Sequence, residues 1–229
     1  MYWQDSNDKK EQFVVPDEIV DLSFKVQCRQ LPLDHAYDLS RAIQEELPWM
    51  ADEPRAGIHL IHGAESGNGW IRPQDPNALL TLSRRTRFML RLPKQKVNAA
   101  TQLAGKRIRV GSHELVLSQP QEKLLSSHTT IFARYIATDY LTDEQAFLNQ
   151  VAGWLGNEGI QARKMISGRA HVLRMPEKDL ATRSLMIASL DIKDSIHLQQ
   201  HGLGAGRKVG CGLFLPHKGI DAVGQSQEK

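Results

Sequence analysis

The 229-residue chain has few of the residues on which several common kinds of site depend. Its only two cysteines, Cys28 and Cys211, form no Cys-x-x-Cys pair, which excludes a zinc ribbon and makes a disulfide scaffold unexpected. No apolar run approaches the ~20 residues that span a bilayer. Residues 1–12 are polar and lack the apolar segment of a secretory signal. We therefore expect a cytoplasmic protein with reduced thiols and no membrane partner.

Aromatic residues are also scarce, at 6% of the chain, and no aromatic motif of the RNA-recognition type is present. This argues against a stacking platform of the usual kind for single-stranded RNA. A P-loop is missing as well, because no Gly-Lys-Ser/Thr sequence follows a predicted strand. We expect no cofactor and no bound metal.

Acidic residues are absent from one long interval, between Asp75 and Glu114. The net charge of the chain is only +3, but this interval holds nine cations. A second acid-free interval, residues 160–176, contains Arg163, Lys164, Arg169 and Arg174. Charge segregated in this way indicates a surface for a polyanion. The alternative is a solvated face whose acidic partners come from other parts of the fold.

The most unusual segment is residues 202–216, GLGAGRKVGCGLFLP, in which five of the first eleven residues are glycine. Consecutive main-chain N–H groups in such a loop can form a concavity for an anion. Arg207 and Lys208 lie within it, so phosphate is the expected anion. The predicted order is helix, glycines and then a strand (211–215), whereas a dinucleotide fingerprint requires a strand before the glycines. A glycine-rich hairpin of purely structural use is the alternative.

Hydrophobic periodicity predicts two halves of the same kind. The first half has strands at 20–28, 57–62 and 88–92, helices at 35–47 and 94–103, and a hairpin at 106–118. In the second, strands at 129–138, 164–174, 184–190 and 211–215 alternate with helices at 142–155 and 194–201. The predicted fold class is α+β, with two tandem ferredoxin-like (RRM-like) domains at 13–120 and 128–218 and a C-terminal glycine-rich loop. The linker is expected near residues 119–128.

Three segments carry a resemblance to a known family: LPLDHAYDL (31–39), GIHLIHG (57–63) and SIHLQQHGLG (195–204) running on to CGLFLP (211–216). Together they resemble the CRISPR endoribonucleases of the repeat-associated (RAMP) superfamily, in the Myxan-type group. The resemblance implies metal-independent cleavage of precursor CRISPR RNA within its repeats. In that reaction a 2′-hydroxyl attacks the adjacent phosphate and leaves a 2′,3′-cyclic phosphate and a 5′-hydroxyl.

The resemblance also implies catalytic residues around the first helix. His35 is the predicted general acid or base, since a helix N-terminus favours the neutral imidazole. Tyr37 is the candidate for orienting the ribose and Arg41 for neutralising the phosphorane charge. The alternatives are that His35 packs or caps the helix, that Tyr37 packs, and that Arg41 is a surface residue six positions from His35. His59 and His62 point to opposite faces of a strand, so they cannot easily share a metal, and His62 is a possible second site histidine.

The predicted partner is CRISPR repeat RNA in the form of a stem-loop, with other CRISPR-associated effector subunits as possible further partners. A-form stems are recognised through shape, phosphates and 2′-hydroxyls, which suits arginine-rich strands. The predicted RNA-binding residues are Arg84, Arg85, Arg87, Arg91, Lys94, Lys96, Arg163, Lys164, Arg169, Arg174, Gly202, Gly204, Gly206, Arg207, Lys208 and Gly210. Two other functions stay open: a non-catalytic RNA-binding subunit of a CRISPR ribonucleoprotein, and a ferredoxin-like regulator that binds a metabolite or nucleotide.

Overall fold

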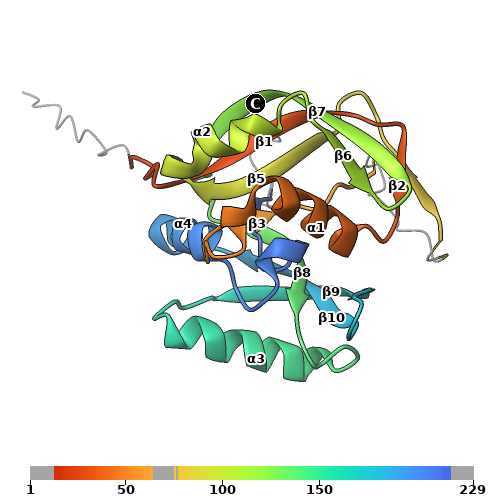
Figure 1. Ribbon diagram of the computed structural model, residues 1–229. Helices are drawn as coiled ribbons and strands as arrows, with labels where there is room; N and C mark the ends of the chain where they lie inside the picture. The colour runs from red at the N-terminus through yellow and green to blue at the C-terminus, as the bar shows by residue number, and fades with distance from the viewer. Residues whose placement is uncertain (1–12, 64–74, 76, 218–229) are drawn as a thin grey trace, which may run out of the picture.

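A computed structural model describes residues 13–63, 75 and 77–217 of the chain. Figure 1 shows a larger sheet in the upper part of the molecule, a smaller sheet below it and one long helix along the lower edge. All strand pairs in both sheets are antiparallel. The protein is therefore of the mixed α+β class, as the sequence predicts.

The larger sheet has the strand order β3-β5-β1-β7-β6. Its strands are β1 (Ile19–Gln27), β3 (Gly57–Ile58), β5 (Arg87–Pro93), β6 (Arg107–Val110) and β7 (His113–Leu124). Helix α1 (Ala36–Glu46) supplies Leu39 and Ile43 to the same core as Val20, Leu22 and Phe24 of β1. The period-two pattern of β1 predicts a strand buried on one face only. Asp21 and Ser23 on the other face are buried too, so β1 is covered on both sides.

The smaller sheet has the strand order β11-β8-β10-β9. Its strands are β8 (Ile131–Ala137), β9 (Lys164–Leu173), β10 (Leu180–Ala188) and β11 (Leu215–Pro216). Helices α3 (Glu144–Asn157) and α4 (Ile192–His201) share a core with this sheet, built around Phe147, Leu198 and Phe214. Asp143 caps α3 by accepting a 2.9 Å hydrogen bond from the Ala146 amide.

Shorter elements complete the described chain: a two-stranded sheet of β2 (Gln30–Pro32) and β4 (Leu79–Thr81), helix α2 (Val97–Ala100), and the 3-10 turns η1 (Pro48–Met50), η2 (Lys94–Lys96), η3 (Thr101–Leu103) and η4 (Arg207–Val209). No helix within the described ranges is long and apolar enough to cross a membrane.

Several predicted boundaries are wrong. The strand predicted at 57–62 is reduced to Gly57–Ile58, and the one predicted at 184–190 is Leu180–Ala188. The predicted helix at 94–103 is a series of η2, α2 and η3, because only four residues make α-helical turns. The strand predicted at 211–215 is reduced to Leu215–Pro216, since residues 211–214 approach other segments with irregular backbone. The predicted linker at 119–128 starts too early, because β7 stays paired with β1 as far as Leu124.

Candidate nucleic-acid interface

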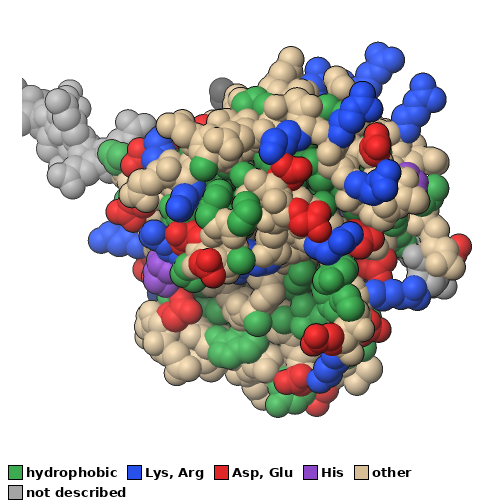
Figure 2. Space-filling view, in the orientation of Figure 1, with side chains coloured by type: hydrophobic (Ala, Val, Ile, Leu, Met, Phe, Trp, Pro, Cys, Tyr) green, Lys and Arg blue, Asp and Glu red, His purple; other side chains and the backbone are tan. Residues whose placement is uncertain are grey.

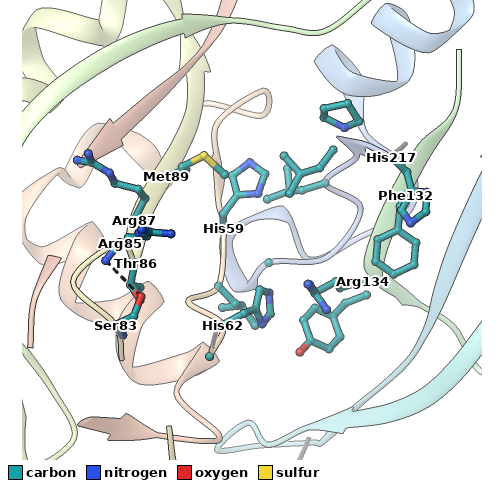
Figure 3. A pocket seen from close by; sticks show the side chains of 17 residues that line it. His59, His62, Ser83, Arg85, Thr86, Arg87, Met89, Phe132, Arg134 and His217 are labelled. Carbon is teal, nitrogen blue, oxygen red and sulfur yellow. Dashed lines mark hydrogen bonds between the residues drawn. The ribbon is translucent and has the colours of Figure 1, made fainter. Parts of the chain in front are cut away.

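A cavity of about 850 Å³ lies between the two sheets, and none of the described residues that line it is acidic. One wall comes from the turn before β5 and from β5 itself, with Arg85 and Arg87. The opposite wall comes from β8 and from the chain beyond β11, with Arg134 and His217. Figure 3 shows these two groups of side chains facing each other across the cavity. Cations on both walls make the cavity suited to a phosphate-bearing ligand.

A row of rings runs from this cavity along the smaller sheet. His62 lines the cavity, and its ring centroid lies 6.0 Å from that of Tyr135 on β8. The Tyr135 ring in turn contacts His171 of β9 edge-on, at 5.8 Å. His62 follows β3 in the chain and lies beside the smaller sheet, where the two walls of the cavity meet. The cavity is therefore lined by three histidines, His59, His62 and His217, as well as by arginines.

Beneath the cavity a buried ion pair joins the two halves of the molecule. Arg91 of β5 is 0% exposed and donates from Nε and NH2 to both carboxylate oxygens of Asp21, each at 2.9 Å. Its NH1 donates to the carbonyl oxygens of Gln199 and Phe214, at 2.9 and 2.7 Å. Four of the five N–H groups of the guanidinium therefore donate to a carboxylate or to carbonyls of the other half. The prediction that Arg91 binds RNA is therefore wrong.

The same ion pair sets the charge state of its neighbours. Burial alone raises the pKa of Asp21, but the Arg91 guanidinium outweighs it and holds that pKa well below its usual range. His59 Nε2 lies 3.7 Å from Asp21 Oδ1, too far for a hydrogen bond, so Arg91 is the main cause. Burial lowers the pKa of His59, against the attraction of Asp21. His59 is therefore a neutral interior residue that reaches the floor of the cavity.

The glycine-rich segment is closely packed against other backbone. Gly202, Gly204, Gly206, Gly210 and Gly212 all have positive φ. Three of their amides already donate hydrogen bonds to backbone carbonyls: Gly202 to Leu198, Gly210 to Arg207 and Gly212 to Tyr135. A Cβ on Gly212 would lie 2.4 Å from the Leu203 carbonyl oxygen. Gly202, Gly210 and Gly212 therefore have a structural role, which the sequence analysis gave as the alternative to phosphate binding. Gly204 remains exposed.

We expect Gly210→Ala to destabilise the protein by about 2 kcal/mol. The residue has φ +88°, which costs an L-residue roughly 1–2 kcal/mol. A Cβ there would also lie 2.5 Å from Leu60 Cγ. Urea unfolding measures the effect, and Gly153→Ala is the matched control. Gly153 lies in α3 with nothing within 4 Å of an added Cβ, so its change should stabilise by up to about 1 kcal/mol. Equal effects of the two substitutions would contradict the packing argument.

The two cations of the glycine-rich segment point into the protein. Arg207 is 9% exposed and donates from NH2 to the carbonyls of Arg55 and Gln200, at 2.9 and 3.0 Å. The Lys208 ammonium donates to the carbonyls of Glu53 and Ala56. Burial lowers the pKa of Arg207 to about 10 and that of Lys208 to about 8. The prediction that these side chains hold RNA phosphate is therefore not supported, because they fasten α4 and η4 to residues 53–56.

His35 lies directly before α1, as predicted, but its ring is buried at 3% exposure. Nδ1 lies 2.8 Å from the carbonyl oxygen of Pro32, and Nε2 accepts a 3.2 Å hydrogen bond from the Ile61 amide. These contacts require the tautomer that carries its proton on Nδ1. Both ring nitrogens are thus engaged by backbone, and the segment from His59 to His62 separates the ring from the cavity. His35 can meet a substrate only if the bond to Ile61 opens.

Tyr37 and Arg41 lie on the exposed side of α1. Tyr37 is 39% exposed, and Arg41 forms an ion pair of 3.3 Å with Glu45 one helical turn later. Neither lines the cavity. The structure does not bring these two residues together with the cationic walls.

The first basic run is divided among three places. Arg84, Arg85 and Arg87 are exposed near the cavity end of β5, with Arg85 and Arg87 lining it. Lys94 and Lys96 lie at the opposite end of that strand, where Lys94 pairs with Glu122 and Lys96 lies over the Trp49 ring. Arg107 and Arg109 are exposed on β6. Figure 2 shows Lys and Arg side chains gathered at the upper right, over the β6–β7 end of the larger sheet.

The second basic run follows β9, the edge strand of the smaller sheet. Arg163, Lys164 and Arg169 are exposed there. Arg174 is also exposed, and its Nε lies 3.8 Å from Asp34 Oδ2, beside the start of α1. These residues are outside the cavity, so they form a separate basic edge.

Arg134 and Phe132 were not among the residues predicted from the sequence. The sequence carried a usable signal, because Arg134 interrupts the otherwise apolar strand IFARYIA. A cation in the middle of a strand that pairs on both sides must be directed at a cavity or a partner. Within the described ranges, no group of three or more His, Cys, Asp or Glu residues is placed to hold a metal ion.

Comparison with known proteins gives consistent results. A family model described as Cas6 Crispr matches residues 20–219. The chain is 31% identical over 197 residues to the CRISPR-associated endonuclease Cas6 of Myxococcus xanthus (strain DK1622), a match that covers 86% of this chain and 81% of that protein.

Solved structures share the fold at low sequence identity. A protein described as CRISPR associated protein Cas6 has a TM-score of 0.59 at 14% identity, covering 88% of this chain and 100% of its own. A RAMP protein that binds different RNA substrates has a TM-score of 0.62 at 11% identity, covering 87% and 100%. Thermus thermophilus Cse3, bound to an RNA representing a pre-cleavage complex, has a TM-score of 0.50 at 10% identity, covering 86% and 98%.

Proposed function

Since the chain belongs to the Cas6 family, we propose that it is an endoribonuclease that cleaves precursor CRISPR RNA within its repeats. The observation that carries the proposal is the cavity between the two sheets, with arginines on both walls, His62 inside it and no acidic side chain among the described residues that line it. A phosphodiester needs cations for its charge and an imidazole for its protons, and this cavity offers both.

The proposed chemistry is transfer of the phosphate to the neighbouring 2′-oxygen. A bond forms between the 2′-oxygen and phosphorus, and the bond from phosphorus to the 5′-oxygen breaks. The 2′-hydroxyl gives its proton to a base, and the departing 5′-oxygen receives one from an acid. No metal enters this scheme, and the products are a 2′,3′-cyclic phosphate and a 5′-hydroxyl.

We propose His62 as the imidazole that takes part in this proton transfer, because it lies between the two walls of the cavity. Of the other two histidines that line the cavity, His59 is buried and His217 lies against the Phe132 ring. His35 is the proposal that follows from sequence resemblance. It would require that the hydrogen bond from the Ile61 amide opens, which would also move the segment that carries His62. Tyr37 and Arg41 as helpers, the basic edge on β9, other effector subunits as partners and a cytoplasmic location remain proposals from the sequence.

The two sheets support a further structural proposal: each is the centre of a ferredoxin-like unit. In the second half, β8, α3, β9, β10, α4 and β11 follow one another, and the strand order β11-β8-β10-β9 agrees with a split βαβ arrangement. In the first half, the order β7-β1-β5-β3 is the same, and β6 is added at the edge. The proposed units correspond to 13–120, extended to Leu124, and 128–218, of which residue 218 lies outside the described residues.

The test incubates labelled repeat RNA with the protein in EDTA. We expect cutting that persists in EDTA and yields a cyclic phosphate end, and a 2′-deoxy substitution at the mapped position should abolish it. Tight binding without cutting would instead identify a non-catalytic RNA-binding subunit. A protein without affinity for RNA would contradict both functions and leave the metabolite- or nucleotide-binding regulator.

The double substitution Arg85→Gln/Arg87→Gln is expected to weaken binding of repeat RNA by roughly tenfold or more, because two phosphate contacts are lost. The slope of log K against log salt should fall by about one to two. A filter-binding salt series measures both quantities. The matched control is Arg107→Gln/Arg109→Gln on β6, which removes the same charge from an exposed strand outside the cavity. Equal losses in the two variants would contradict binding in the cavity.

A further inference from the structure

The wall of the cavity that belongs to the smaller sheet carries aromatic surface as well as charge. Phe132 of β8 and His217, just beyond β11, both line the cavity, with ring centroids 6.0 Å apart and planes at 56°. The Arg134 guanidinium lies 5.9 Å from the Phe132 ring centroid. Figure 3 shows these three side chains together on one side, opposite Arg85 and Arg87. The rings are tilted and not stacked on each other, so a planar ligand can lie against either.

We infer that Phe132 and His217 form a subsite for one unstacked nucleobase of a single-stranded RNA segment. The inference rests on the proposed function, since it assumes that the cavity takes RNA. A base presents a flat π-face that stacks on an aromatic ring or on a guanidinium whatever its sequence. Apolar neighbours on the same wall, Leu213 and Leu215, continue the surface that a base would cover.

The opposite wall explains why the ligand is a nucleotide within a strand and not a free base. Arg85 and Arg87 lie across the cavity from the rings, at the place where the phosphates on either side of the base would lie. Ser83 and Thr86 beside them add hydroxyl groups. The volume of about 850 Å³ is within the range of ligand cavities that enclose more than one small group. A paired base has both faces covered by its neighbours in the helix, so duplex RNA cannot use this subsite.

The experiment compares three RNA probes with the full chain: a uridine decamer, a decamer of the same length built from abasic tetrahydrofuran phosphates, and a blunt RNA duplex. Phe132→Leu keeps an apolar side chain in β8 but removes the ring. It is expected to weaken binding of the uridine decamer about tenfold. Binding of the abasic decamer and of the duplex should change less than twofold. Tyr140→Leu, which removes an exposed aromatic ring outside the cavity, is the matched control and should change none of the three.

Three results would overturn the inference. If Phe132→Leu weakens the uridine and abasic decamers equally, or weakens neither, the ring recognises no base. If free uridine monophosphate binds as tightly as the decamer and competes with it, the ligand is a free nucleotide. If Phe132→Leu does not fold, His217→Ala at its exposed position takes its place with the same expectation.

Failure of this inference and failure of the proposed function are separable. Cleavage of repeat RNA by the unaltered protein tests the function alone. If it cleaves but Phe132→Leu binds both decamers normally, the subsite is wrong and the function stands. If it does not cleave but the uridine decamer depends on Phe132, the subsite stands and the nuclease assignment is wrong.

Discussion

His62→Ala is expected to slow cleavage of repeat RNA by at least about 100-fold while RNA affinity changes less than threefold. The range for losing a general acid or base is 10²–10⁴. The reason is position: His62 lines the cavity together with arginines from both walls. Single-turnover cleavage with saturating protein separates the chemical step from binding. His113→Ala on β7, a histidine outside the cavity, is the control and should cleave normally.

The comparison with His35→Ala decides between the two histidines. Removing the His35 ring leaves the Pro32 carbonyl and the Ile61 amide without their partner, at a cost of about 1–3 kcal/mol in unfolding free energy. Its activity must therefore be measured well below its unfolding temperature. Full cleavage by His62→Ala together with none by folded His35→Ala would return the catalytic role to His35.

Arg91→Ala is expected to lower the free energy of unfolding by about 3–5 kcal/mol, a large part of the 5–15 kcal/mol typical of a domain. The substitution leaves the buried Asp21 carboxylate without its bidentate partner and the carbonyls of Gln199 and Phe214 without a donor. Urea unfolding followed by circular dichroism measures it. Arg87→Ala, four residues earlier on the same strand but exposed, should cost less than about 0.5 kcal/mol. A loss below 1 kcal/mol for Arg91→Ala would contradict the role given to this pair.

The effect of Arg91→Ala should also depend on pH. In the unaltered protein the pKa of Asp21 is depressed, so its contribution to stability is present above the unfolded value near 4 and is lost as the pH falls through the lower folded value. In Arg91→Ala, burial without the guanidinium raises the pKa of Asp21 above that of the unfolded chain. As the pH falls, protonation of Asp21 then removes part of the destabilisation of the variant. The difference in unfolding free energy between the two proteins is therefore expected to narrow toward pH 4.

Local sequence signals predicted most of the regular fold. The spacing of Leu39, Ile43 and Leu47 located α1 to within one residue at each end. The helix predicted at 142–155, with Thr142 as its cap, is α3 at Glu144–Asn157, and Asp143 is the residue that caps it. The alternation in residues 20–28 located β1 but not the burial of its second face. The second face is buried because the other half of the molecule covers it, and the alternation of residues within β1 carries no information about that contact. The strand predicted at 211–215 failed for a related reason, since contacts with distant backbone override its apolar pattern.

The site was harder to predict because charge in a sequence does not state where a side chain points. Arg87 and Arg91 belong to one basic run and one strand, yet one faces the cavity and the other is buried on Asp21. Arg207 and Lys208 lie among glycines as a phosphate loop would have them, but Arg207 NH2 and the Lys208 ammonium donate to carbonyls at residues 53–56 and 200. Arg134 had a signal in the sequence, as the one cation in an apolar strand, but Phe132 had none, because its importance arises only when β8 faces the larger sheet across the cavity.

The guanidinium of Arg91 has a mechanical consequence for the cavity above it. Arg91 belongs to β5, which forms part of one wall of the cavity. Its side chain donates hydrogen bonds to the backbone of α4 and to Phe214, just before β11, and the chain beyond β11 forms part of the other wall. The hydrogen bonds of Arg91 therefore fix the distance between the two walls at the floor of the cavity. If RNA binds as proposed, it must enter the cavity from its open side, since the two walls cannot separate without breaking the hydrogen bonds of Arg91.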